Sequence, residues 1–204
     1  MENPKIFTPI LYINLEKRKD RKEHMEKQLK NYNFERVNAI ENENGYVGCA
    51  ESHIKCLKLA IERNYEEVII LEDDFMFLNG NNFNDMKIPE FDFDILLFCN
   101  RIKKCEKIDE TFNKVIDCSW ASGHLVRKKL YEPLIQNLQE SKELIKKENC
   151  YKYHNDIYWN KLWKEYKCIS YNYNFSTQKE GYSDIEKKNV KRLEQQNIES
   201  MFNK

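Results

Sequence analysis

The chain has 204 residues, a length that predicts a single domain over residues 1–204 with a sizeable core. Its 34 Lys and Arg residues balance its 34 Asp and Glu residues, so we expect no nucleic-acid partner. The sequence shows neither a signal sequence nor an apolar segment long enough to cross a membrane, so we expect a cytoplasmic protein without a transmembrane segment.

The first expected elements are a strand and a basic helix. Residues 7–15 are mostly apolar and predict a strand, and residues 17–21 open a helix. Basic side chains just past the carboxyl end of a strand can reach a phosphate in the crevice there. We therefore consider Arg18 and Arg21 as phosphate ligands, with a solvated helix face as the alternative interpretation.

A second helix is indicated by apolar residues that recur with helical spacing. These residues are Ala50, Ile54, Leu57 and Ile61. We expect Ser52 and His53 in the first turn, where free N–H groups and the positive end of the helix dipole attract anions. A structural role for this pair is the alternative, and no acid is placed to complete a catalytic triad.

Three acids follow directly on a short apolar run. Residues 68–71 predict a strand that is buried on both faces, and Glu72, Asp73 and Asp74 come next. Crowded ionised carboxylates at a core edge repel one another and lose hydration, and a bound cation relieves both costs. On an extended chain, Glu72 and Asp74 project to the same side. We predict a divalent-cation site that holds a phosphorylated ligand, with merely solvated loop acids as the alternative.

The second half of the chain continues to alternate between strands and helices. Strands are predicted at 91–99, 115–118, 122–126 and 168–172, and helices at 128–147, 153–163 and from 183 to about 201. The charged segment 101–113 lacks periodicity and is expected to be a mobile loop over a site. Alternating elements of this kind predict an α/β fold with a mostly parallel sheet.

The cysteines indicate neither a disulfide framework nor a zinc site. The chain has seven of them and no Cys-x-x-Cys pair. Most lie among apolar neighbours, and we interpret them as reduced, buried thiols.

Short motifs in a fixed order resemble those of glycosyltransferase family 25, the lipooligosaccharide and collagen hydroxylysine sugar transferases. The matching pieces are Ile13-Asn14-Leu15 with Arg21, Gly48-Cys49-Ala50-Glu51-Ser52-His53, Leu71-Glu72-Asp73-Asp74, Phe93-Asp94-Ile95-Leu96, Ala121-Ser122-Gly123-His124-Leu125, Asn155-Asp156, and Gln178 with Ser183-Asp184-Ile185. The resemblance covers about residues 10–186, and we expect residues 187–204 to be a charged helix or tail. His124 departs from the family pattern, which more often has Tyr at this position.

The resemblance implies a GT-A-like, Rossmann-like α/β fold with a mostly parallel central sheet flanked by helices. It also implies a metal-dependent, inverting transfer of a hexose from a UDP-sugar, with UDP-galactose or UDP-glucose as the first choices. The acceptor would be a hydroxyl of a glycan or of a glycosylated or hydroxylated protein. The divalent cation would be Mn²⁺, with Mg²⁺ as the second choice. The short chain favours a bacterial or virus-encoded member over a lumenal collagen enzyme.

The resemblance also implies roles for particular residues. Glu72 and Asp74 would be the metal ligands, with Asp74 as the direct one. The UDP-sugar site would include Ile13, Asn14, Leu15, Arg18, Arg21, Ser52, His53 and Asp73. The acceptor and sugar cleft would include Trp120, Gly123, Asn155, Gln178, Ser183 and Asp184. Asp156 is the candidate catalytic base, and the competing assignments for it are a helix cap or a metal ligand.

Two other functions would use the same acids. One is a metal-dependent phosphohydrolase or nucleotidyltransferase, which would release phosphate and transfer no sugar. The other is a non-catalytic relative that binds a sugar nucleotide without turnover. Binding of UDP with and without Mn²⁺, followed by assays for turnover, separates these hypotheses.

Overall fold

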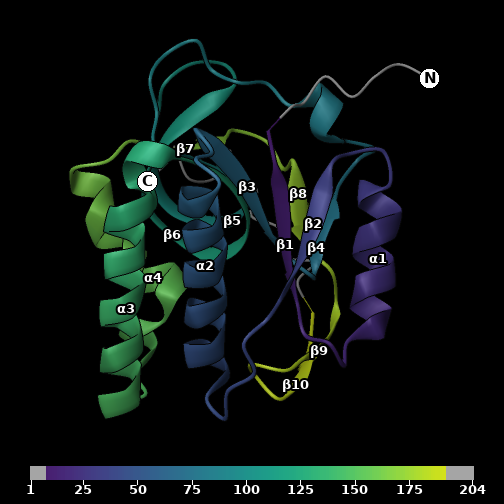
Figure 1. The fold of residues 1–204 in the computed structure, drawn as a ribbon. Helices are drawn as coiled ribbons and strands as arrows, with labels where there is room; N and C mark the ends of the chain where they lie inside the picture. The colour runs from purple at the N-terminus through teal and green to yellow at the C-terminus, as the bar shows by residue number, and fades with distance from the viewer. Residues whose placement is uncertain (1–7, 192–204) are drawn as a thin grey trace.

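The computed structural model describes residues 8–191, and its centre is a six-stranded sheet with the order β2-β1-β3-β6-β5-β7 (Figure 1). The strands are β1 (Ile10–Asn14), β2 (Phe34–Asn38), β3 (Glu67–Glu72), β5 (Ile95–Lys107), β6 (Phe112–Arg127) and β7 (Cys168–Tyr171). β1 pairs in parallel with β2 and β3, and β5 pairs in parallel with β7. Only β6 of this sheet runs against its neighbours β3, β5 and β7. The predicted α/β class with a mostly parallel central sheet is therefore confirmed.

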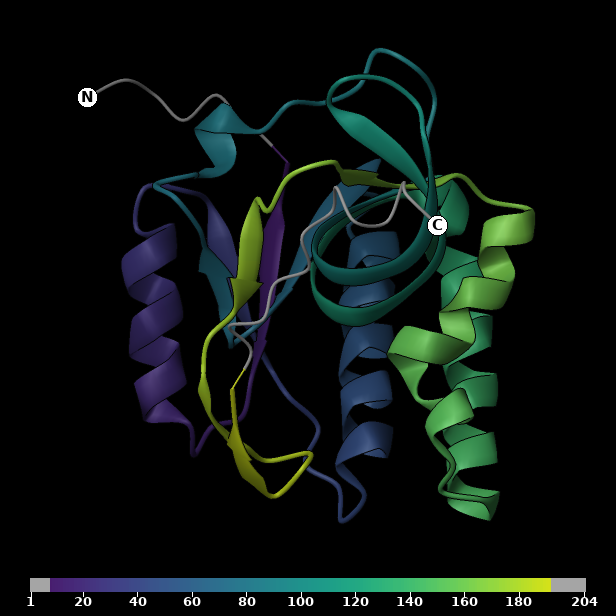
Figure 2. The same cartoon turned by 180° about the vertical axis from the view of Figure 1, so that it is seen from behind.

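Helices flank the sheet, with α1 on one face and α2, α3 and α4 on the other (Figures 1 and 2). The α-helices are α1 (Lys19–Leu29), α2 (Gly45–Glu62), α3 (Tyr131–Lys147) and α4 (Asn155–Tyr158). Single 3₁₀ segments lie at Phe83–Asp85, Lys128–Leu130, Tyr151–Tyr153 and Trp159–Lys164. Two small sheets complete the described chain: β4 (Phe75–Phe77) with β8 (Ser176–Gln178), and β9 (Gly181–Ser183) with β10 (Lys188–Val190).

Alternating side chains of the central strands divide the core into two layers. On β1, Tyr12 packs in a cluster with Met25 and Leu29 of α1. Leu11, the preceding residue, belongs instead to the cluster that includes Leu57 of α2. Successive strand residues point to opposite faces, so a fully apolar strand can bury both of its faces under helices. Each buried aliphatic or aromatic side chain contributes roughly 1.5–3 kcal/mol to stability.

The segment 101–113, which we expected to be a mobile loop, forms the second half of β5, the turn after it and the first two residues of β6. Ile102, Phe112 and Val115 are buried along this β5–β6 hairpin, while most of the side chains between them are exposed. The prediction was wrong because so few apolar residues face the core that no periodicity appears. The two short strands predicted after this segment are parts of the continuous strand β6.

The helix expected to begin at residue 183 is absent from the part of the chain that the structure describes. Ser183 ends β9, and its Oγ accepts a hydrogen bond from the Glu186 N–H at 3.1 Å. The predicted capping contact therefore forms, but it closes a turn that leads into β10. The remainder of the predicted helix, residues 192–204, lies outside the described residues.

Within residues 8–191, no helix is long and apolar enough to cross a lipid bilayer. The six cysteines whose side chains are described are free thiols: Cys49, Cys56, Cys105, Cys118, Cys150 and Cys168. The cytoplasmic location stays a prediction.

Candidate active site

The acidic turn lies at the carboxyl edge of the central sheet, where β1 and β3 run side by side. Asn14 ends β1, Glu72 ends β3, and Asp73 and Asp74 form the turn into β4. Ligands of open α/β sheets bind outside the carboxyl ends of the strands. Two pockets open at this edge, with volumes of about 290 and 370 Å³.

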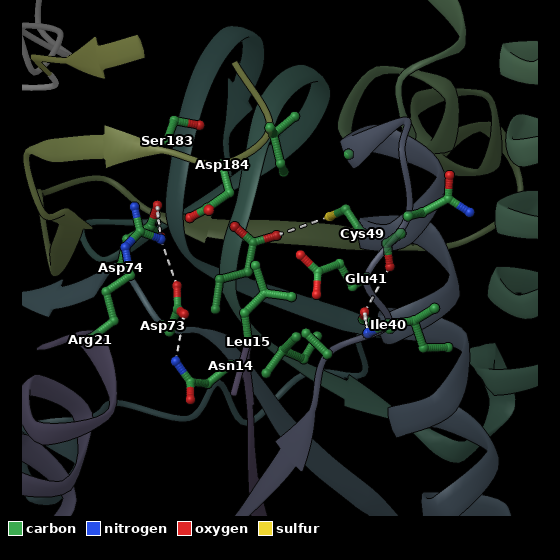
Figure 3. A pocket seen from close by; sticks show the side chains of 18 of the residues that line it. Asn14, Leu15, Arg21, Ile40, Glu41, Cys49, Asp73, Asp74, Ser183 and Asp184 are labelled. Carbon is green, nitrogen blue, oxygen red and sulfur yellow. Dashed lines mark hydrogen bonds and ion pairs between the residues drawn. The ribbon is translucent and has the colours of Figure 1, made fainter. Parts of the chain in front are cut away.

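The first pocket lies between the end of β1, the start of α2 and the segment 183–187. Figure 3 shows Arg21, Asp73 and Asn14 on one side of this pocket and Cys49 and Ile40 on the opposite side. Most of the residues predicted to contact the nucleotide line it: Ile13, Asn14, Leu15, Arg21, Ser52, His53 and Asp73.

The second pocket lies between β6, the start of α4 and strand β8. It brings together four residues of the predicted acceptor cleft with the candidate base: Trp120, Asn155, Gln178, Ser183 and Asp156. Tyr46 lines it as well, and its ring stacks on His154 with the ring centres 3.5 Å apart. Aromatic rings offer a ligand large, rigid apolar faces.

The two pockets share one border. Five residues line both of them: Cys49, Glu72, Asp74, Ser183 and Ile185. The two predicted metal ligands therefore face the space where ligands of the two pockets would meet.

Asp73 is engaged by side chains of the first pocket. Asn14 Nδ2 donates to Asp73 Oδ2 at 2.8 Å, and Arg21 Nη1 donates to Asp73 Oδ1 at 2.6 Å. Burial raises the pKa of Asp73, and the nearby Arg21 guanidinium opposes this shift. Arg21 Nη1 also lies 3.6 Å from Asp74 Oδ2. Asp73 thus fixes Arg21 beside the acidic turn, where the guanidinium can face a phosphate.

Glu72 accepts hydrogen bonds from three side chains on two other elements. Oε1 accepts from His53 Nε2 at 3.0 Å and from Cys49 Sγ at 3.5 Å, and Oε2 accepts from Ser122 Oγ at 3.2 Å. Burial alone would raise the pKa of Glu72, but the hydrogen bond from His53 and its charge lower it. Glu72 is therefore held as an oriented carboxylate.

The donor set of Glu72 and Asp74 fits a hard divalent cation. Both residues supply carboxylate oxygens at the shared border, and Mn²⁺ and Mg²⁺ prefer oxygen ligands. The hydrogen bonds from His53 and Ser122 would also orient Glu72 if it held such an ion.

Asp156 lies at the start of α4 and lines the second pocket. Its Oδ2 accepts a hydrogen bond from the backbone N–H of Trp120 at 2.9 Å. Desolvation raises the pKa of Asp156, and the negative charge of Glu72 adds to the increase. Trp120 has a φ of +69°, a strained value for a bulky side chain, and the bond to Asp156 restrains it there. A carboxyl group with a raised pKa beside a pocket suits a general base.

Two predicted site residues line neither pocket. The guanidinium of Arg18 is bound by Asp20, Asp184 and the Tyr182 carbonyl. Gly123 lies under the ring of Phe75, where an added Cβ would come within 2.6 Å of a ring carbon. In this structure Arg18 therefore binds the segment 182–184, and Gly123 leaves room for the ring of Phe75.

Three predicted site residues have different positions from those expected. Asp184, predicted for the acceptor cleft, lines the first pocket and pairs with Arg18 at 2.5 Å. Ser52 and His53 lie beyond the first turn, because α2 already begins at Gly45. Ser52 Oγ donates to the Gly48 carbonyl at 2.7 Å and accepts from the Ile40 N–H at 2.8 Å, so it fixes the loop before α2.

Several lining residues escaped the sequence analysis because neither an apolar run nor a cluster of acids in their local sequence marks them. They include Ile40, Asn42, Ile185, Arg101, Tyr46 and Tyr151. Gly48 could have indicated that the loop before α2 packs closely on this helix. A Cβ at Gly48 would meet the Ile40 carbonyl oxygen at 2.5 Å. A glycine inside an apolar helix marks such a close approach.

The model of glycosyltransferase family 25 (LPS biosynthesis protein) matches residues 43–201. The protein is therefore a glycosyltransferase, as its two-pocket acidic site had suggested. More specifically, the chain belongs to glycosyltransferase family 25, and the resemblance found in the sequence is confirmed. No curated protein matches the chain.

Solved structures with similar folds include proteins of several kinds. One is a glycosyltransferase involved in the glycosylation of the major capsid of PBCV-1, with 14% identity, 80% of each chain covered and a TM-score of 0.49. A protein from STIV has 12% identity over 93% of this chain and 96% of its own, with a TM-score of 0.45. A nucleoside-diphosphate-sugar pyrophosphorylase from Vibrio cholerae RC9 has 14% identity over 80% of this chain and 72% of its own, with a TM-score of 0.42. None of these likenesses identifies a ligand for this chain.

Proposed function

We propose that the protein is a divalent-cation-dependent, inverting glycosyltransferase. Its donor is a UDP-sugar, UDP-galactose or UDP-glucose in the first place, and its acceptor is a hydroxyl of a glycan or of a glycosylated or hydroxylated protein. This proposal rests on one observation: Glu72 and Asp74 line both pockets, at the border that the pockets share. A transferase needs such a border, because its two substrates must meet at the reacting carbon.

The first pocket suits the donor. Ile13 and Leu15 offer apolar contacts for a base, and Arg21 can face the phosphates. A divalent cation held by Asp74 and Glu72, Mn²⁺ first and Mg²⁺ second, would neutralise the charge that grows on the departing diphosphate. Arg21 is already fixed by Asp73, so little ordering is needed when the donor binds.

The second pocket suits the acceptor. The aromatic side chains of Trp120, Tyr46 and Tyr151 provide faces for a sugar ring. Asp156 takes the proton of the acceptor hydroxyl while the acceptor oxygen forms its bond to the anomeric carbon. The bond from that carbon to the donor phosphate oxygen breaks in the same displacement, and the electron pair leaves with UDP. One displacement inverts the anomeric configuration.

Calorimetry with UDP tests the donor site. Wild-type protein is expected to bind UDP in the presence of Mn²⁺ and to lose this binding with a chelator. Asp74→Ala should remove the metal-dependent binding while the circular dichroism spectrum is unchanged. Asp92→Ala is a matched control, since Asp92 is an exposed acid that lines neither pocket. Metal-independent UDP binding, or full binding by Asp74→Ala, would contradict the proposal.

Turnover assays test the reaction. A screen of UDP-sugars for slow hydrolysis without acceptor is expected to identify the donor sugar, and NMR of a transfer product should show inverted configuration. Phosphate release without sugar transfer would favour the phosphohydrolase or nucleotidyltransferase alternative. UDP binding without any turnover would favour a non-catalytic relative.

A further inference from the structure

Cys49 and His53 lie four residues apart on α2 and therefore project from the same face of the helix. Glu72, at the end of β3, meets them there. Cys49 Sγ, His53 Nε2 and one Glu72 carboxylate oxygen all lie within 4.8 Å of one another. The individual separations are 3.0 Å from Nε2 to Oε1 and 3.5 Å from Sγ to Oε1. Ligand atoms around a tetrahedral zinc ion are about 3.3–3.6 Å apart, so the separation from Sγ to Oε1 already matches. The contact from Nε2 to Oε1 is a hydrogen bond, and it would lengthen by about 0.3 Å when the metal displaces the proton between the two atoms.

We propose that Cys49, His53 and Glu72 form a site for a borderline-soft transition metal, Zn²⁺ in the first place. A thiolate, an imidazole and a carboxylate are ligands that zinc prefers, whereas Mn²⁺ and Mg²⁺ favour oxygen alone. The site therefore differs in chemistry from the pair of Glu72 and Asp74, although both include Glu72.

The surroundings of the triad support this assignment. Asn155 Nδ2 donates to Cys49 Sγ at 3.3 Å, and Ser122 Oγ donates to the second oxygen of Glu72 at 3.2 Å. Outer contacts of this kind orient metal ligands. Cys49 and Glu72 also line both pockets, so a fourth coordination position would face open space.

The shared carboxylate has a consequence for catalysis, and this part rests on the proposed function. Glu72 already contacts Cys49 and His53 through Oε1, so zinc would bind the same carboxylate that Glu72 offers to the hard cation beside Asp74. Two divalent ions on one carboxylate repel each other, so zinc would compete with the hard cation and inhibit sugar transfer.

Titration of the metal-free protein with Co²⁺, the spectroscopic substitute for zinc, tests the site. One equivalent is expected to produce a thiolate-to-cobalt charge-transfer band, which Zn²⁺ abolishes on displacing the cobalt. Cys49→Ser should lose the band and weaken Zn²⁺ binding at least about tenfold. Cys105→Ser should retain both, because Cys105 is a partly buried free thiol outside both pockets. A wild-type protein without the band, or a Cys49→Ser protein with it, would overturn the proposal.

A second measurement tests the competition between the two ions and distinguishes a failure of the zinc proposal from a failure of the proposed function. One equivalent of Zn²⁺ is expected to suppress Mn²⁺-dependent UDP binding by wild-type protein more than by Cys49→Ser, when each protein is compared with its own zinc-free affinity. Equal suppression in both proteins would show that zinc acts elsewhere and would overturn the competition. If wild-type protein shows no Mn²⁺-dependent UDP binding at all, the proposed function fails, and the cobalt spectrum still decides on the zinc site.

Discussion

The carboxyl group of Asp156 combines a useful reactivity with a cost to stability. Desolvation raises its pKa above the ordinary value for an aspartic acid. A pKa raised in the folded state means that the ionised group favours folding less than the neutral one, so stability falls as pH rises through the shifted pKa. The same shift makes the carboxylate a better proton acceptor for a hydroxyl.

Asp156→Asn should therefore lower kcat and raise the melting temperature at neutral pH. The amide oxygen can still accept the bond from the Trp120 N–H, so the local structure is kept without the charge. Loss of a general base costs about 10²–10⁴-fold in rate. Steady-state kinetics and thermal melts measure the two effects. A variant that loses metal-dependent UDP binding instead would make Asp156 a metal ligand.

For single residues, the sequence drew attention to three acids but not to the side chains that contact them. Glu72, Asp74 and Asp156 were singled out because acids at the ends of apolar elements are conspicuous, and all three line the pockets. The contact between Cys49 and Glu72 was missed, since it joins residues 23 positions apart. The sequence indicated no zinc site because no Cys-x-x-Cys pair occurs, and the spacing of Cys49 and His53 on one helix face was not considered.

The packing of β6 against the acidic turn depends on the absence of a side chain at Gly123. A Cβ there would meet two carbons of the Phe75 ring at 2.6 and 2.7 Å. Phe75 is completely buried, so its ring has little room to move.

Gly123→Ala is expected to lower the free energy of unfolding by about 1–3 kcal/mol through overpacking. Urea denaturation measures the loss. In a double-mutant cycle, Phe75→Leu should recover part of it, because the smaller side chain leaves space for the added methyl group. Full additivity of the two changes would contradict the proposed clash.

The β9–β10 hairpin is tied to the start of α1 by two arginines. Arg18 Nη1 donates to the Tyr182 carbonyl at 3.0 Å and to Asp184 Oδ2 at 2.5 Å, and Arg21 Nη2 donates to the same carbonyl at 3.0 Å. The hairpin carries Ser183 at the border of the two pockets, so these bonds position part of the site.

Arg18→Ala should loosen the hairpin. Hydrogen bonds to charged groups contribute about 1.5–3 kcal/mol, so amide exchange within residues 181–190 is expected to accelerate at least about tenfold. UDP affinity should fall as well. Lys22→Ala is the control, because Lys22 makes only an exposed pair with Glu26 on the same helix. Unchanged exchange in Arg18→Ala would show that other contacts hold the hairpin.

A helix or strand could be predicted where its own segment shows an apolar run or a helical spacing of apolar residues. The apolar run of β3 and the helical spacing of α2 and α3 were sufficient to place those elements. The distal part of the β5–β6 hairpin, residues 101–113, was not predictable, because its strands are stabilised by pairing with each other and expose charged side chains. Such pairing leaves no periodic signal within either strand.

For the whole molecule, the response to acid depends in part on His124. This side chain is fully buried in the centre of the sheet, and burial lowers its pKa from 6.5 to about 3. In the unfolded chain it regains its ordinary pKa, so the unfolded state binds the additional proton between these two values. Stability is therefore complete above the ordinary pKa and is lost as pH falls toward about 3.

His124→Phe should flatten this dependence. The wild-type protein is expected to lose up to about 1.4 kcal/mol per pH unit from this residue below its ordinary pKa. A phenyl ring preserves an aromatic contact with Trp159, whose ring centre lies 5.8 Å from that of His124, and cannot titrate. Urea midpoints measured across the acid range compare the two proteins. Parallel curves would show that other groups dominate the acid response.

The border shared by the two pockets also has a kinetic consequence if they hold the two substrates of the proposed reaction. Glu72 and Asp74 line both spaces, so the two substrates would contact each other there. Direct transfer between neighbouring pockets needs both substrates bound at once in a ternary complex. Double-reciprocal plots at several fixed acceptor concentrations are therefore expected to give intersecting lines, and parallel lines would contradict direct transfer.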